Sequence, residues 1–130
     1  MRYLNIRKGQ FTFANKTIGP VIESRIILAG KRFLQWTPNG LVGERICYDE
    51  GHLPNGWTLA YDLDLELDKV RYRLTIHDGA VQHGFKPYIA HLQFRNCRLE
   101  DVVTRITVED KPRGYPALKF ELMPGVSSFS

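Results

Sequence analysis

Apolar and charged residues alternate with a period of two over residues 61–77, YDLDLELDKVRYRLTIH, and no other feature constrains the fold as much. Successive side chains of a β-strand point to opposite faces of the sheet, so each half of this stretch predicts a strand with one apolar face and one charged face. Asp68-Lys69 separates the halves and has the composition of a tight turn. The stretch therefore predicts a β-hairpin.

One register satisfies both faces of this hairpin. With Leu67 opposite Val70, the charged face pairs Glu66 with Arg71, Asp64 with Arg73 and Asp62 with Thr75. The other face is then apolar throughout. A shift of one residue would turn the apolar set toward water, so the register is strongly specified. The opposed charges contribute about 0.2–1 kcal/mol per pair and select the register more than they hold the fold.

Asp62, Asp64 and Glu66, called the carboxylate row below, also suggest a Mg²⁺ site of a nuclease or an acid–base pair of a hydrolase. Metal ligands must converge on one point, whereas alternate residues of a strand lie side by side, about 6.5–7 Å apart. We therefore interpret the row as a solvated face neutralised by arginines. The chain also has no recognisable catalytic triad, no Gly-rich phosphate loop and no Cys/His cluster. We expect no catalytic residues, no metal site, no cofactor and no enzymatic activity.

The rest of the chain repeats the alternation in short segments bounded by Gly, Pro, Asn or Asp, which predicts an all-β fold of the small barrel or sandwich type. We expect one β domain over residues 1–124, a loosely held tail at 125–130, and at most one short helix, a turn within 98–106. The two strands of the hairpin are expected at 57–67 and 70–77, and the remaining expected strands are 3–7, 10–14, 21–28, 31–36, 44–48, 87–95, 102–109 and 117–122.

A second hairpin is expected near the C-terminus. Setting Val108 opposite Leu118 pairs Ile106 with Phe120 and Arg105 with Glu121. The connecting loop, DKPRGYP, places two cations and an aromatic ring at its tip. Such a tip can contact a phosphate backbone and stack on a base, and it is equally the composition of an ordinary turn. Its candidate residues are Lys111, Arg113 and Tyr115.

The net charge of +4 is distributed unevenly. Residues 1–48 carry eight Lys or Arg against two Glu, residues 49–68 carry six acids and no base, and residues 69–130 carry ten bases against six acids. Basic residues also adjoin aromatic ones in the first part, a combination that suits polyanions. Whether the two aromatic side chains there are buried or exposed is left open by the pattern. These candidates are Arg7, Lys8, Lys31, Arg32, Phe33 and Trp36.

No run of residues approaches the about 20 apolar residues needed to cross a bilayer, and the start, MRYLNIRKGQFTF, has no apolar core of a secretory signal. We expect no membrane association and a cytoplasmic protein. In that setting Cys47 and Cys97 are expected as reduced thiols.

The layout of the chain resembles phage-encoded replication and recombination proteins of the single-stranded-DNA-binding type. The segments that carry the resemblance are RKGQFTF, the long strand VIESRIILAGKRFLQW, and the pair VVTRITV and PALKFEL flanking a basic turn. The resemblance implies an OB-like Greek-key barrel with extra hairpins, located in the cytoplasm of a host cell, and binding through aromatic and basic residues. The tail PGVSSFS contains Phe129 but no acid, unlike the acidic tip of bacterial single-strand-binding proteins, so recruitment of repair enzymes through it is in doubt.

The leading hypothesis is a non-catalytic protein that binds single-stranded DNA or RNA. In it, the six basic candidates contact phosphates, while Phe33, Trp36 and Tyr115 stack on bases. The alternative is a protein-interaction module, such as a phage accessory, virion or host-inhibitor protein, whose aromatic surface docks a protein. A homodimer through edge strands is compatible with either hypothesis.

Overall fold

The structure is a computed structural model, and it describes residues 2–46, 56–77, 79–109 and 117–123. Strands make up most of this part of the chain, so the all-β prediction is confirmed. The strands are β1 (Arg2–Tyr3), β2 (Asn5–Arg7), β3 (Gln10–Phe13), β4 (Lys16–Gly19), β5 (Val21–Thr37), β6 (Gly40–Ile46), β7 (Trp57–Leu67), β8 (Val70–His77), β9 (Thr104–Glu109) and β10 (Ala117–Leu122). The helical segments are η2 (Ala80–Phe85, a π-helix), α1 (Lys86–Phe94) and η3 (Leu99–Asp101, a 3-10 turn).

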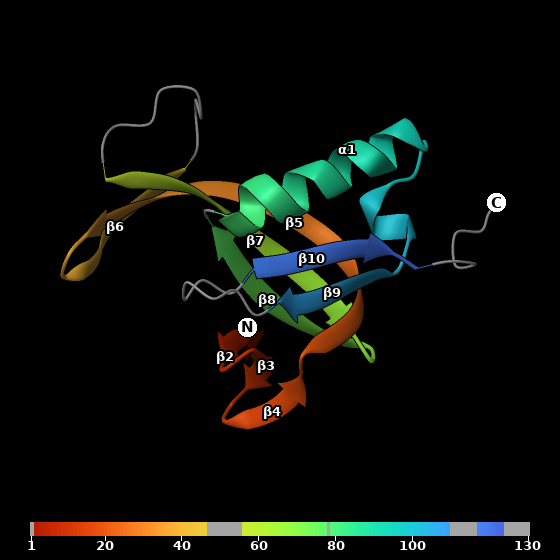
Figure 1. The fold of residues 1–130 in the computed structure, drawn as a ribbon, viewed down its shortest axis with the longest axis horizontal. Coiled ribbons are helices and arrows are strands. Elements are labelled where there is room, and N and C mark those ends of the chain that lie inside the picture. The colour runs from red at the N-terminus through yellow and green to blue at the C-terminus, as the bar shows by residue number, and fades with distance from the viewer. Residues whose placement is uncertain (1, 47–55, 78, 110–116, 124–130) are drawn as a thin grey trace.

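A seven-stranded sheet forms the body of the molecule, in the order β1-β8-β7-β5-β9-β10, with β6 also pairing with β5 (Figure 1). β5 organises this sheet because its first residues pair with β9 while the rest pair with β7 and β6. The expected strands 21–28 and 31–36 are therefore one strand, continuous through Gly30. β6 and the adjoining ends of β5 and β7 extend away from the body as an arm.

The expected closed barrel is wrong for the part of the chain that the structure describes. The ladder ends at β1 on one side and β10 on the other, and these edges are not hydrogen-bonded to each other. Part of the opening is filled by the helix: the carbonyl of Leu118 in β10 lies so close to Gly84 in η2 that a Cβ there would be 2.6 Å from it. A helix in this position prevents the strand-to-strand pairing that a barrel needs.

Both hairpin registers are confirmed. β7 and β8 pair Leu67 with Val70, Asp64 with Arg73 and Tyr61 with Ile76, as the alternation predicts. β9 and β10 pair in the predicted register as well, with Val108 opposite Leu118. The apolar faces of the two hairpins meet in one core, which also includes Phe11 of β3.

The strand expected at 87–95 is wrong, because this segment is helical. Its buried side chains continue the spacing of those in η2: Val81, Phe85, Tyr88 and Leu92 are separated by four, three and four residues, which is the period of a helix. Pro87 lies in the first turn of α1, where a proline is tolerated. The helical turn expected within 98–106 corresponds to η3, which covers three residues of it.

The helix is tied to the sheet by a buried polar contact. The hydroxyl of Tyr88 lies 2.6 Å from Oγ1 of Thr104 in β9, and both residues are buried. Burial raises the pKa of the Tyr88 hydroxyl above its ordinary value of 10.0, since the charged phenolate is poorly solvated there. The bond fixes α1 against β9.

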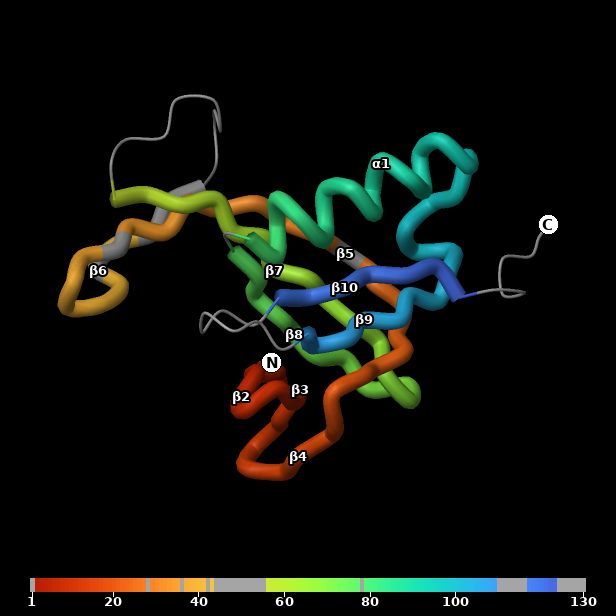
Figure 2. Tube along the Cα trace, viewed as in Figure 1, coloured from red at the N-terminus to blue at the C-terminus, as the bar shows by residue number. Residues whose placement is uncertain are grey.

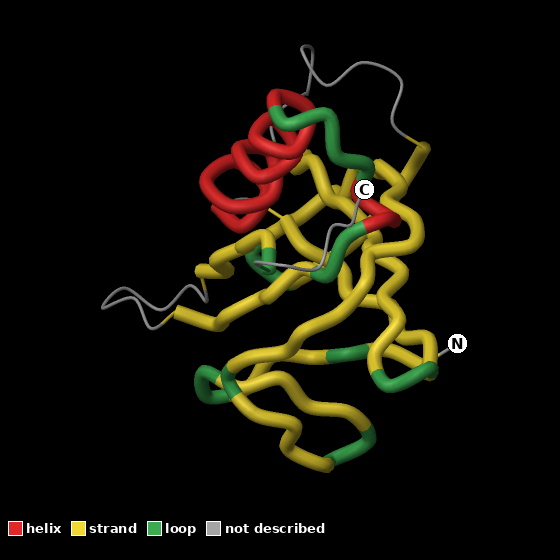
Figure 3. The backbone as a smooth tube through the Cα atoms, turned by 90° about the vertical axis from the view of Figure 1, so that its right-hand side faces the viewer, coloured by secondary structure: helices red, strands yellow, loops and turns green. Residues whose placement is uncertain are grey.

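A second, three-stranded sheet consists of β2, β3 and β4 and lies at the opposite end of the molecule from α1 (Figures 1 and 3). The chain trace shows it beside the N-terminus, next to the main sheet (Figure 2). β4 was not among the expected strands, because KTIG is short and lacks a repeated apolar alternation. This small sheet positions the site described next.

Candidate nucleic-acid interface

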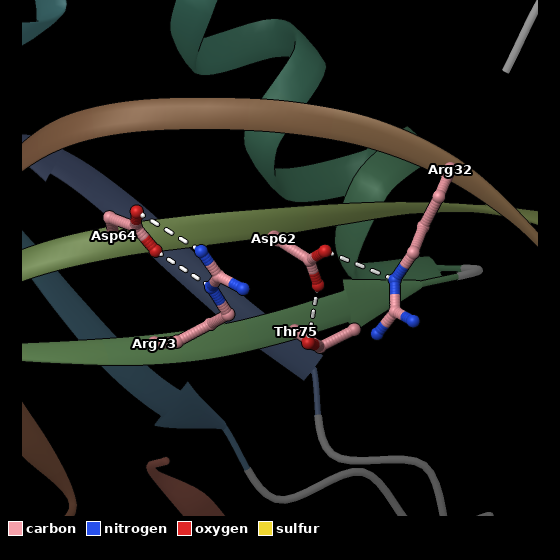
Figure 4. A network of polar contacts seen from close by, with 5 residues as sticks. All are labelled: Arg32, Asp62, Asp64, Arg73 and Thr75. Atoms are coloured by element: carbon pink, nitrogen blue, oxygen red, sulfur yellow. Dashed lines mark hydrogen bonds and ion pairs between the residues drawn. The ribbon is translucent and has the colours of Figure 1, made fainter. Parts of the chain in front are cut away.

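The carboxylate row is engaged with arginines and a threonine. Nε of Arg73 donates to Oδ1 of Asp64 at 2.8 Å and its Nη2 donates to Oδ2 at 3.3 Å (Figure 4). Oδ1 of Asp62 accepts a 2.6 Å hydrogen bond from Thr75, and its Oδ2 lies 3.1 Å from Nε of Arg32. The hydrogen bond to Asp64 raises the pKa of the Arg73 guanidinium.

Glu66, the third member of the row, lies opposite Arg71 in β8 and opposite Arg25 in β5. Within the described ranges no ion pair joins Glu66 to either arginine, and no group of His, Cys, Asp and Glu side chains has a metal-binding arrangement. The interpretation that the row is neutralised by its neighbours is thus confirmed for Asp62 and Asp64, but the expectation of a solvated face is wrong for Asp64, which is only 8% exposed. The strand register places Glu66 between Arg25 and Arg71.

The candidate binding residues are separated into two described groups. Arg7 and Lys8 lie together at the turn between β2 and β3, and both are exposed. Lys31 and Arg32 lie far along the chain in β5, where Nζ of Lys31 is 5.8 Å from the centroid of the Tyr61 ring and Arg32 contacts Asp62. Lys31 and Arg32 therefore both interact with side chains of the neighbouring strand β7.

The expected stacking role of Phe33 is wrong. Its side chain is 7% exposed and belongs to the core, while its neighbour Leu34 is 3% exposed. Adjacent residues of a strand are both buried only where both faces of the strand are covered, a tertiary feature that alternation does not reveal. Trp36 lies in β5, opposite Leu41 of β6, and its side chain is not described. Lys111, Arg113 and Tyr115 lie outside the described residues, as does the tail at 125–130.

The small sheet has one apolar face and one polar face. Ile6, Phe11 and Phe13 face the core: Phe11 is fully buried and Phe13 packs edge-on against the ring of Tyr72 at 5.2 Å. Two tight turns allow this short meander, since Lys8-Gly9 and Ala14-Asn15 all have positive φ, as two-residue hairpin turns require. Apolar packing therefore orients the opposite face toward solvent.

Cross-strand neighbours build the polar face. Asn5, Thr12 and Thr17 form one row across the three strands, and Arg7 pairs with Gln10 in the next. These side chains line a groove of about 440 Å³, together with Lys8, Ala14 and Asn15. Among the described residues, this lining contains two cations, three amides and two hydroxyl groups but no acid. The first acid in the chain is Glu23, so residues 1–22 carry only positive charges.

Tyr3 lies beside this groove and was not among the candidate residues. It is 55% exposed, and it borders a larger cleft of about 1030 Å³ that also contains Asn5. Asn5 thus belongs to both the groove and the cleft. A ring exposed beside a groove of hydrogen-bond donors has the geometry of a stacking platform. The sequence signal that could have found the site is the acid-free stretch before Glu23.

None of the described helices is long and apolar enough to span a bilayer. No protein-family model, curated protein or solved structure matches the chain.

Proposed function

We propose that the protein binds single-stranded nucleic acid along the polar face of β2–β4, with phosphates against Arg7 and Lys8 and one base on Tyr3. The observation that carries the proposal is the composition of the groove, which combines cations, amides and hydroxyl groups and has no acid among its described lining residues. Phosphate oxygens accept hydrogen bonds from all of these groups. An acid-free cationic surface also attracts polyanions at long range.

The exposed ring of Tyr3 favours a single strand over a duplex. Bases inside a duplex are stacked on each other, whereas those of a single strand are free to stack on a protein side chain. The amides of Asn5, Gln10 and Asn15 are suited to base edges that a single strand leaves uncovered. A role in replication or recombination is part of the same proposal.

Two lysines in matching positions provide the test. Lys8 and Lys69 both lie in two-residue hairpin turns, both are exposed, and both have positive φ, 52° and 65°. Only Lys8 lies on the groove. Fluorescence anisotropy of a labelled 12-nucleotide strand, measured over a salt series, should show weaker binding for Lys8→Gln and unchanged binding for Lys69→Gln.

The salt dependence makes the test quantitative. Each phosphate contact that is lost lowers the slope of log K against log salt by about 0.7 for a single strand. We expect that decrease for Lys8→Gln alone, and a similar one for Arg7→Gln. Absence of binding at low salt, or equal losses in Lys8→Gln and Lys69→Gln, would show that the proposal is wrong.

Stacking is tested separately. Tyr3→Phe should bind like the unmodified protein, whereas Tyr3→Ala should lose about 1–3 kcal/mol of binding free energy with an unchanged salt slope. Phe94→Ala is the matched control, because Phe94 is 89% exposed and lies at the end of α1, away from the small sheet.

A further inference from the structure

The cleft beside Tyr3 lies along the seam where the main sheet fails to close. A cavity over the face of a strand contacts alternate residues, but this one is lined by every residue of β8 from Arg73 to His77 and by consecutive residues Tyr3–Ile6. It therefore follows the strand edge. β1 pairs with β8 at Tyr72 and Arg73, and the N–H of Leu4 donates to the carbonyl of Arg73 at 2.9 Å, so the cleft opens at the end of this short pairing.

The opposite wall comes from η2 and from the end of the β9–β10 hairpin, including Ala80, His83, Glu109, Ala117 and Leu118. The cleft of about 1030 Å³ is at the upper end of the usual size of small-ligand sites, about 300–1,000 Å³. Buried side chains such as Leu74, Ile76 and Leu118 form an apolar floor.

The charged residues around the cleft indicate which chemical groups of a ligand it can bind. Arg73 is engaged by Asp64 through two hydrogen bonds. Glu109, at the end of β9, is exposed and lines the cleft. It is the one acidic residue among the described lining residues. A carboxylate repels phosphate, but it accepts hydrogen bonds from an amine, as Glu and Asp do from the N4 amino group of cytosine.

We propose that this cleft receives an unstacked base that bears an exocyclic amine, such as cytosine or adenine, from the strand whose backbone lies on the β2–β4 groove. The inference rests on the proposed function. Asn5 and Tyr3 connect the two sites, since both border the cleft and Asn5 also lines the groove. The ring of the base packs on the apolar floor, and its amine donates to the Glu109 carboxylate.

The first experiment compares 12-nucleotide thymidine strands that differ at one central position: thymine, cytosine, adenine, or an abasic sugar. All four carry the same phosphates, so differences between them report on the base alone. We expect cytosine and adenine to bind at least about 5-fold more tightly than thymine, the lower end of what one base-specific contact contributes. The abasic strand should bind no better than thymine.

The second experiment tests the residue. Glu109→Gln replaces a pure acceptor with an amide that both donates and accepts, so the preference for cytosine over thymine should fall to about 2-fold or less. Glu121→Gln is the matched control, because Glu121 lies in the same hairpin but does not line this cleft. Ala117→Leu, which adds bulk to the wall, should reduce the preference while the salt slope stays unchanged.

The outcomes separate the two proposals. If all four strands bind equally and with a normal salt slope, the cleft assignment is wrong and the groove proposal stands. A cytosine preference that survives Glu109→Gln also overturns the assignment. If no strand binds at low salt, the proposed function fails and the cleft assignment fails with it. Circular dichroism of each variant identifies any loss of fold, and the comparison of bases within one folded variant is independent of its stability.

Discussion

The outer face of β7–β8 and the outer face of β2–β4 are both polar sheet surfaces, but they differ in how their charges are arranged. On β7–β8, Asp62 and Asp64 meet Arg32 and Arg73 within 3.1 Å, so the charges neutralise one another within the sheet. On β2–β4, the cations have no acid beside them in the groove. The face with more charges is therefore the one whose charges are already paired, and charge balance, not charge density, distinguishes the two faces.

Removing the packing beneath the polar face should have the largest effect. Phe11 is fully buried and joins the small sheet to the core, so Phe11→Ala should lower the free energy of unfolding by about 3–5 kcal/mol. Urea denaturation measures this loss. Phe11→Leu keeps most of the apolar volume and should lose less, and equal losses for the two variants would show that the small sheet does not depend on this packing.

Breaking the charge balance on β7–β8 should have a smaller effect on stability. Asp64→Ala leaves Arg73 without its two-point partner and should cost about 1–2 kcal/mol, a value reduced because the arginine side chain is 32% exposed. Glu121→Ala, which removes a more exposed partner of Lys119, should cost less than about 0.5 kcal/mol. If Asp64→Ala is as mild as Glu121→Ala, the row does not stabilise the sheet.

Asp64→Ala is also expected to change the binding of nucleic acid. Without Asp64, Arg73 loses its hydrogen-bonded partner and is left with the weaker coulombic influence of Asp62, at the edge of the cleft beside Tyr3. Asp64→Ala should therefore increase nucleic-acid affinity and steepen the salt slope by up to about 0.7, in contrast to Lys8→Gln. An unchanged slope would mean that the strand does not pass Arg73.

The smallest expected effect concerns a third polar environment, the buried pair of Tyr88 and Thr104. The unfolded chain releases the Tyr88 proton near pH 10, whereas the folded protein retains it because burial raises the pKa. The contribution of this group is complete below pH 10, and stability should decline as the pH rises above 10. Tyr88→Phe should cost about 1 kcal/mol at pH 7 and flatten that decline. Thermal unfolding between pH 8 and 11 measures both, and an equally steep decline in Tyr88→Phe would assign it to other groups.

The alternation of apolar and polar residues predicted the registers of both hairpins. The register of β7–β8 follows from alternation and opposite charges between neighbours, and these interactions act over a few residues. The helix was missed because Gly84 and Pro87 resemble turn residues. Gly84 is instead compatible with the close approach of η2 to the carbonyl of Leu118, a contact between segments distant in sequence.

The candidate site was predicted in part. Arg7 and Lys8 were found because they are basic residues close to aromatic ones. Tyr3 and the amides of the groove were missed, because isolated polar residues in a short meander carry no pattern until cross-strand pairing aligns them. Phe33 was misassigned since its burial depends on what covers the second face of β5.

The sequence by itself determined the all-β class, the two hairpin registers and the pairing of Asp64 with Arg73, because each depends on residues a few positions apart on one ribbon. Only the tertiary structure decided that the sheet stays open, that residues 80–94 form a helix over the gap, and that Asn5 borders both the groove and the cleft while Tyr3 borders the cleft. These features depend on which of several segments, distant from one another in the chain, pairs with a given strand edge or covers a given apolar face. Three-dimensional packing decides this, and local sequence pattern does not.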